Sequence, residues 1–233
     1  MAQTTAQDFF GGAIRGVVPQ RWIDASNLRE IPDHQELFLS PETLSNLIIE
    51  INQRVSQEDA LSAFTTLSQQ NPSLAAANGA DSSEAIDQAA ALYHMQDLCD
   101  EGDSMQIITP PQQMSLARLT ASAPAGTLVS AYKGVVQFKT APKQRGGQAP
   151  ATNATAAASP GGAGAPMSQL TCHYLLVRLE AQESDLLVFF NVPHEEFEKN
   201  GDAQGLEREK AIAEETVAAF VDGLEIQDWG LFL

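Results

Sequence analysis

The sequence predicts an α+β fold, in which helices pack against a mostly antiparallel sheet. The predicted strands follow one another in runs, and so do the predicted helices. Two apolar segments near the end of the chain, 174–180 and 185–193, are joined by a short polar connection, which is typical of an antiparallel hairpin. Both segments carry apolar residues on both faces, which indicates a central position in the sheet with cover on both sides.

Further strands are expected earlier in the chain. Residues 132–139 alternate apolar and polar side chains, as a half-buried strand does. Shorter apolar runs predict strands over 10–19, 35–40, 47–51 and 104–109. The first of these contains Gly11 and Gly12, which are interpreted as strand positions because they do not open a helix as a nucleotide-binding glycine turn would.

Three helices are predicted. Residues 57–70 and 83–98 carry apolar residues at helical spacing. Residues 206–224 place their apolar side chains near one stripe, with acids in the first turn and Gly223 near the end. This last segment is therefore expected to be an amphipathic helix whose charges suit the helix dipole.

Residues 141–166 differ in composition from the rest of the chain. They contain nine Ala, five Gly and four Pro, with no acid and no large apolar side chain. Such a segment cannot offset its ordering entropy by burial, so it is predicted to be a flexible inserted loop within one domain spanning 1–233. The smaller insert 73–83 is expected to connect two helices in the same way.

The composition narrows the classes of partner. Thirteen basic and 30 acidic residues give a net charge of −17, so nucleic acid and anionic membrane surfaces are not expected partners. The longest strongly apolar run, 186–192, is far shorter than the about 20 residues of a membrane span. The chain shows no signal peptide, and Cys99 and Cys172 are isolated, which favours a soluble protein of a reducing compartment.

The usual signatures of catalysis are missing. No phosphate-binding loop is present, and His194 begins a segment that lacks the second histidine of a zinc-protease motif. The four histidines are scattered, and His173 within a strand is better interpreted as structural than as a ligand. A pair of carboxylates could form a hydrolase site, but no pair is singled out. The expectation is a protein without metal, cofactor or covalent chemistry.

Acidic residues are concentrated in the first half of the chain. Between Arg54 and Arg118 there is no Lys or Arg, yet there are nine acids. Between residues 24 and 50, Arg29 is the one base among six acids. Such a field attracts a basic protein partner, unless the acids are separate solvated faces that only keep the chain soluble.

The segment 9–39 resembles the start of the Ran guanine nucleotide release factor family, the Mog-type Ran-binding proteins. The family pattern has an aromatic residue and Gly-Gly-Ala, then two aliphatic positions, then the string D-x-S-x-L-R-x-V-P-D-x-Q-E-V-aromatic. It is met at Phe10, Gly11, Gly12, Ala13, Val18, Pro19, Asp24, Ser26, Leu28, Arg29, Pro32, Asp33, Gln35, Glu36 and Phe38. Weaker similarities follow at 45–52, 93–98, 174–193 and 228–233.

This resemblance implies a fold and a function. The fold would be an α/β/α sandwich with a mainly antiparallel central sheet covered by helices on both faces, as in the PsbP proteins. The chain would bind the GTPase Ran as a monomer, promote release of its guanine nucleotide and support nuclear protein import, in nucleus and cytoplasm. The expected contact residues are Asp24, Arg29, Glu30, Asp33, Glu36 and Glu50.

Each of these residues also has a structural alternative. Asp24 or Ser26 could cap a short turn, and Asp33 could hold the turn after Pro32. Arg29 could pair internally with Glu30 or Asp33. Gln53 stands where family members often carry a second acid, which leaves that part of the surface weaker. The alternative function is a ligand-binding or scaffolding module on the same fold.

Overall fold

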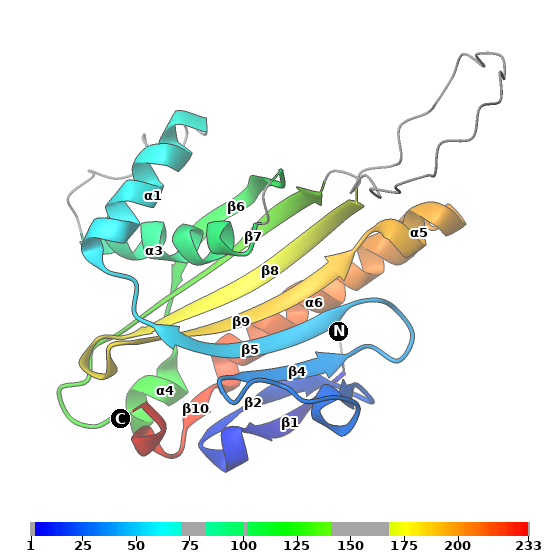
Figure 1. Ribbon diagram of the computed structural model, residues 1–233. Helices are drawn as coiled ribbons and strands as arrows, with labels where there is room; N and C mark the ends of the chain where they lie inside the picture. The colour runs from blue at the N-terminus through cyan, green and yellow to red at the C-terminus, as the bar shows by residue number, and fades with distance from the viewer. Residues whose placement is uncertain (1–2, 71–82, 100–101, 141–167, 233) are drawn as a thin grey trace, which may run out of the picture.

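The computed structural model describes residues 3–70, 83–99, 102–140 and 168–232. They form a seven-stranded sheet of order β3-β4-β5-β9-β8-β7-β6 and a three-stranded sheet of order β1-β2-β10, with every pairing antiparallel (Figure 1). The strands are β1 (Thr4–Phe9), β2 (Ile14–Pro19), β3 (Ile23–Asp24), β4 (Gln35–Leu39), β5 (Asn46–Gln53), β6 (Ser104–Met114), β7 (Val129–Thr140), β8 (Ser168–Leu179), β9 (Ser184–Pro193) and β10 (Glu225–Ile226).

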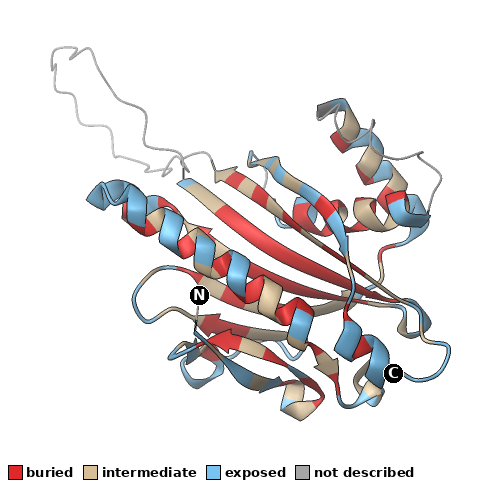
Figure 2. Ribbon diagram, turned by 180° about the vertical axis from the view of Figure 1, so that it is seen from behind, coloured by how far each residue is buried: buried red, intermediate tan, exposed pale blue. Residues whose placement is uncertain are grey.

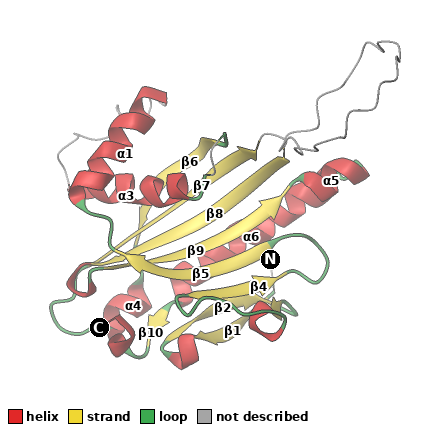
Figure 3. Cartoon of the chain, in the orientation of Figure 1, coloured by secondary structure: helices red, strands yellow, loops and turns green. Residues whose placement is uncertain are grey.

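The helices cover both faces of the large sheet. They are α1 (Gln57–Gln70), α3 (Ser83–Asp97), α4 (Ala117–Ser122), α5 (Glu195–Asn200) and α6 (Ala203–Gly223), with short 3₁₀ turns η1 (Phe10–Gly12), η2 (Ala25–Asn27), η3 (Glu180–Gln182) and η4 (Trp229–Phe232). Helices α1 and α3 lie on one face, whereas α6 and the small sheet lie on the other (Figure 3). The predicted α+β sandwich is therefore confirmed. None of the described helices is long and apolar enough to span a membrane.

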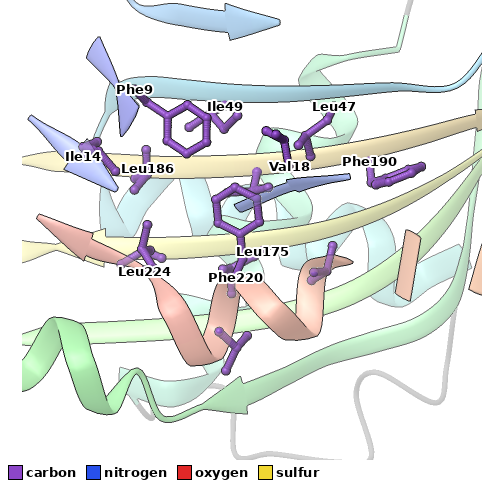
Figure 4. Packing of buried hydrophobic residues seen from close by; sticks show 14 of the residues in the cluster. Phe9, Ile14, Val18, Leu47, Ile49, Leu175, Leu186, Phe190, Phe220 and Leu224 are labelled. Atoms are coloured by element: carbon purple, nitrogen blue, oxygen red, sulfur yellow. The ribbon is translucent and has the colours of Figure 1, made fainter. Parts of the chain in front are cut away.

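Two hydrophobic cores follow from the alternation of side chains along β8 and β9. Tyr174 and Leu176 pack under α3, whereas Leu175 and Val177 pack under α6. The α6 core also holds Phe220. Figure 4 shows this core, with side chains from β1, β2, β5, β9 and α6 meeting. The central hairpin is thus buried on both faces, as its sequence predicted.

The predicted strand 10–19 is wrong in its first half. Gly11 and Gly12 have φ values of +66° and +97°, so they form the turn that joins β1 to β2. A left-handed backbone suits glycine because it carries no Cβ. Strand β1 was not predicted, because its first five residues, TTAQD, contain no large apolar side chain and give no strand pattern.

The other predicted elements are confirmed with adjusted ends. Strand β6 continues past 109 through two prolines, with register shifts between Ile107 and Gln112. It is the outermost strand of the sheet, where prolines are tolerated. Strands β7 and β8 pair up to Thr140 and Ser168, on either side of the predicted loop 141–166, which lies outside the described residues. Most of the predicted insert 73–83 also lies outside them.

Candidate functional site

The segment 24–36 is an ordered surface connection between β3 and β4. Its start is fixed by Asp24, whose carboxylate Oδ1 accepts a hydrogen bond from the Ser26 N–H at 2.8 Å and so caps η2. Its end is fixed by a backbone hydrogen bond of 2.9 Å from the Gln35 N–H to the Pro32 carbonyl. The expected capping role of Asp24 is therefore confirmed, and the turn after Pro32 is closed by backbone atoms.

Between these two fixed ends lie exposed charged side chains. Arg29, Glu30 and Asp33 are all exposed. None of the three forms an ion pair with another described residue, so the alternative of an internal Arg29 pair with Glu30 or Asp33 is wrong within the described chain. These side chains are therefore exposed to solvent.

Glu50 lies beside the end of this segment, although it is far away in sequence. It is the cross-strand partner of Gln35, whose Nε2 donates to Glu50 Oε2 at 2.7 Å. A second bond of 3.0 Å joins the Ile51 N–H to the His34 carbonyl. The β4–β5 pairing thus brings Glu50 next to the turn that carries Asp33.

Glu36 points to the opposite face of the sheet, because neighbouring strand residues alternate. Its Oε1 accepts a hydrogen bond of 2.6 Å from the Phe10 N–H, at the β1–β2 turn. Burial raises the pKa of Glu36, the Phe10 bond partly opposes this, and the negative charge of Asp24 raises the pKa further. The structure therefore places Glu36, on β4, and Glu50, on β5, on different faces of the sheet.

Leu28 is a candidate contact that charge arguments did not select. Its side chain is 66% exposed, next to Arg29 and Glu30. A single exposed leucine is common on protein surfaces, so Leu28 is a candidate only because it lies beside the exposed charged side chains of this segment. The signal was present in the sequence, because Leu28 is an apolar residue inside a run of polar ones.

A cavity of about 340 Å³ opens beside Glu50 on the α1 and α3 face. Its lining includes Asp59 from α1 together with Tyr93 and Asp97 from α3. Gln53, where a second acid was expected from the family pattern, also borders it. Acids from three elements therefore surround one hollow, and Gln53 adds no charge to it.

A buried network of charged side chains adjoins the cavity beside Glu50. The Arg178 guanidinium donates to Asp185 at 3.1 Å, to Asp87 at 2.7 Å and to the Val55 carbonyl at 2.6 Å. Asp185 also accepts from the Val55 N–H at 3.0 Å and lies 2.9 Å from His94. The network ties β8 and β9 to α3 and to the end of β5. Sequence reasoning missed it, because its members are far apart in the chain.

Comparison with known proteins now identifies the family. The family model described as Ran-interacting Mog1 protein matches residues 7–193. This chain belongs to the Mog1 family. The match covers β1 to β9, including the whole 24–36 segment and Glu50.

Family members are similar to the chain over short segments. A probable Ran guanine nucleotide release factor of Dictyostelium discoideum is 45% identical over 47 residues, or 20% of this chain and 24% of that protein. The Ran guanine nucleotide release factor of Homo sapiens is 43% identical over 51 residues, or 22% and 27%. The nuclear import protein MOG1 of Saccharomyces cerevisiae is 34% identical over 68 residues, or 24% and 31%. The chain thus spans about a quarter to a third of these relatives.

Solved Mog1 structures share the fold over their full length. The crystal structure of the Saccharomyces cerevisiae Ran-binding protein Mog1p matches with a TM-score of 0.52 and 19% identity, and covers 100% of both chains. A point mutant of protein Mog1 matches with a TM-score of 0.53 and 18% identity, and covers 99% of this chain and 100% of that one. At this identity the match shows a common architecture.

Proposed function

We propose that this chain binds a Ran-type small GTPase and promotes the release of its guanine nucleotide. It acts by binding and carries out no covalent step. Membership of the Ran-interacting Mog1 family supports the choice of partner. The hydrogen bond between Gln35 and Glu50 carries the proposal, because it joins the acid of β5 to the exposed acidic segment in one continuous surface.

The proposed contact set comprises Asp24, Arg29, Glu30, Asp33, Glu36 and Glu50, with distinct roles. Glu30, Asp33 and Glu50 offer carboxylates to basic groups of the GTPase, and Arg29 offers a guanidinium to an acidic one. Asp24 and Glu36 shape the surface, since each accepts a backbone hydrogen bond that fixes one part of it. Leu28 adds apolar contact area beside the charges.

Nucleotide release follows from differential affinity. A GTPase holds its nucleotide through a lysine-bearing loop and Mg²⁺, both of which act on the phosphates. A partner that binds the nucleotide-free state more tightly than the loaded state lowers the affinity of the GTPase for its nucleotide by the same factor. Carboxylates suit this role because they pair with basic groups that the phosphates otherwise occupy.

Attraction at long range supports the same proposal. The chain carries a net charge of −17, which speeds the encounter with a basic partner by about tenfold or more at low salt. A protein that acts on Ran and supports nuclear import is expected in both nucleus and cytoplasm.

The test is a release assay with purified Ran loaded with a fluorescent guanine nucleotide. Stoichiometric addition of the full chain should accelerate the loss of fluorescence in the presence of excess unlabelled nucleotide. Unchanged release at saturating chain would contradict the proposal. Binding to Ran without faster release would instead support the alternative of a scaffolding module.

A further inference from the structure

A second cavity lies on the other face of the sheet, between α6 and strands β6 to β8. Its volume is about 490 Å³, within the range of small-molecule sites. Helix α6 packs over β8, β9 and β2, and Figure 2 shows β7 and β6 extending past it. The cavity, which we call the α6 cavity, is distant from the proposed GTPase surface because it lies across the sheet from Glu50.

The wall of the α6 cavity on the sheet side is mixed, with polar side chains beside the apolar Ile108 and Val135. Val136 packs in the core under α3, and Tyr132 interacts with Asp87 of that helix. Lys133 and Gln137 alternate with these two residues, so their side chains turn toward α6. Lys133 is the cross-strand partner of Gln112, and Gln137 is that of Thr171. A sheet face of this kind offers hydrogen-bonding groups to a ligand where a core would offer apolar ones.

The most unusual member of the wall is His173. Its side chain is 8% exposed and lines the cavity. No described residue provides a hydrogen-bond partner for its Nε2 atom. A buried polar atom without a partner destabilises the folded state, so such atoms call for an explanation. The neighbouring Thr171 hydroxyl does not provide one, since it lies 2.8 Å from His194 Nε2.

Two positively charged side chains act on His173. Lys133 from β7 and Lys210 from α6 both lower the pKa of His173, in addition to the effect of burial. The Lys210 ammonium donates one hydrogen bond of 2.9 Å to Glu207. Its two other N–H donors take no part in that bond. Lys133 forms no ion pair with another described residue. Two acids, Glu207 and Glu214, line the rim with exposed side chains.

We propose that the α6 cavity binds a small molecule that carries a compact oxyanion, a phosphate or a carboxylate, held by Lys133, Lys210 and the Nε2 of His173. The two ammonium groups supply charge, and the imidazole N–H supplies a directed hydrogen bond. Such a bond would give a partner to the buried Nε2 atom of His173, which has none among the described residues. In a chain with 13 bases and 30 acids, two lysines beside the unpartnered Nε2 of His173 offer cationic groups to an anion, and the acids of the cavity lie at its rim.

The NMR signals of the histidine imidazoles, recorded on the isotope-labelled full chain, report on this site directly. We expect inorganic phosphate or succinate to shift the His173 signal, assigned with His173→Gln, along a saturable curve. Choline chloride at equal ionic strength should not shift it. The two anions, titrated separately, distinguish a phosphate ligand from a carboxylate ligand. If neither anion gives a saturable shift, the proposal is wrong.

Variants that each remove one lysine distinguish binding in the α6 cavity from general attraction of anions to positive charge. Lys133→Met and Lys210→Met should each weaken binding about tenfold, since a charge-assisted hydrogen bond is lost. Lys199→Met removes an exposed lysine from α5 and should leave the affinity unchanged. Equal affinities in all three variants would overturn the proposal, provided that circular dichroism shows each to be folded.

A pH series adds a readout that a structural histidine would not give. Sulfate keeps its charge between pH 5 and pH 7, so its binding reports on the protein alone. A bound anion favours the imidazolium, and sulfate should therefore bind more tightly at pH 5 than at pH 7 in the wild type. His173→Gln should lose most of this dependence. The groups around His173 are Lys133, Lys210, Glu207, Glu214 and His194, and they are common to both proteins. Equal pH dependence in both would contradict the proposed role of His173.

Discussion

The Gln35 side-chain amide donates a hydrogen bond of 2.7 Å to the Glu50 carboxylate across the β4–β5 pair. This bond fixes the direction of a carboxylate that would otherwise sample several rotamers. It also engages only one of the two carboxylate oxygens, so the second keeps its capacity for a basic partner. The pairing is the structural link between the 24–36 segment and the acid of β5.

The exposed leucine of this surface should contribute to binding but not to folding. Leu28→Ser removes apolar contact area that is already 66% exposed in the unbound chain. We expect Ran affinity to fall about tenfold, in the range of a moderate interface contact. The free energy of unfolding should change by less than about 0.5 kcal/mol. Calorimetric titration and urea unfolding of the same samples check both values, and unchanged affinity would exclude Leu28 from the interface.

The buried network beneath the surface should dominate local stability. Arg178→Ala leaves Asp185, which is 0% exposed, without its main counter-charge. We expect the free energy of unfolding to fall by about 3–5 kcal/mol. The matched variant Arg118→Ala breaks an exposed pair with Glu225 and should cost less than about 1 kcal/mol. Similar losses for both variants in urea would show that the network contributes little.

The free energy of unfolding should decrease as the pH is lowered, partly because of His173. Burial and two lysines lower its pKa from 6.5 to about 4, so the unfolded chain gains a proton before the folded chain does. The contribution of His173 to the free energy of unfolding is therefore complete above pH 6.5 and decreases as the pH falls toward 4. Between pH 7 and pH 5 the loss is about 2 kcal/mol. Between the same two pH values, the free energy of unfolding of His173→Gln should fall by about 2 kcal/mol less than that of the wild type. The measurement uses chloride buffers without phosphate or carboxylate.

Equal pH dependence in the two proteins would contradict this assignment. The pKa of His194 is also lowered, chiefly by burial. Its contribution is present in both proteins and cancels in the comparison.

The segment 141–166 should be dispensable for folding. Strands β7 and β8 pair up to Thr140 and Ser168, so their ends are neighbours that a short hairpin turn can join. Replacement of residues 141–167 by Asn-Gly should shift the melting temperature by less than about 4 °C. Scanning calorimetry of the two proteins tests this, and a large decrease would show that the segment packs against the fold.

The sequence was most informative where patterns are long. The β8–β9 hairpin and α6 carry apolar residues over ten or more positions, and both were predicted with the right type. The ends of β9 and α6 were right to within three residues, whereas β8 begins six residues before its predicted start. Strand β1 was missed, because it pairs with β2 through backbone bonds and carries polar side chains. The turn at Gly11 was read as a strand, since glycine is compatible with either conformation.

The candidate site was predicted as a set of residues but not as a surface. The family pattern singled out both Glu36 and Glu50, yet only strand register shows that they face opposite sides of the sheet. The contacts of Arg178 and His173 were not predictable, because they depend on which side chains of α3, α6 and β9 fold against these strands. Whether the six predicted residues contact Ran stays a prediction.

The most direct test of the proposed function compares nucleotide release from Ran with two charge reversals. Glu50→Lys places a positive charge where the surface is proposed to bind basic groups. Glu195→Lys makes the same change on α5, toward the opposite end of the sheet (Figure 1). We predict that the wild type and Glu195→Lys accelerate release equally, whereas Glu50→Lys loses about tenfold or more of that effect. Equal acceleration by a folded Glu50→Lys variant would contradict the proposed surface.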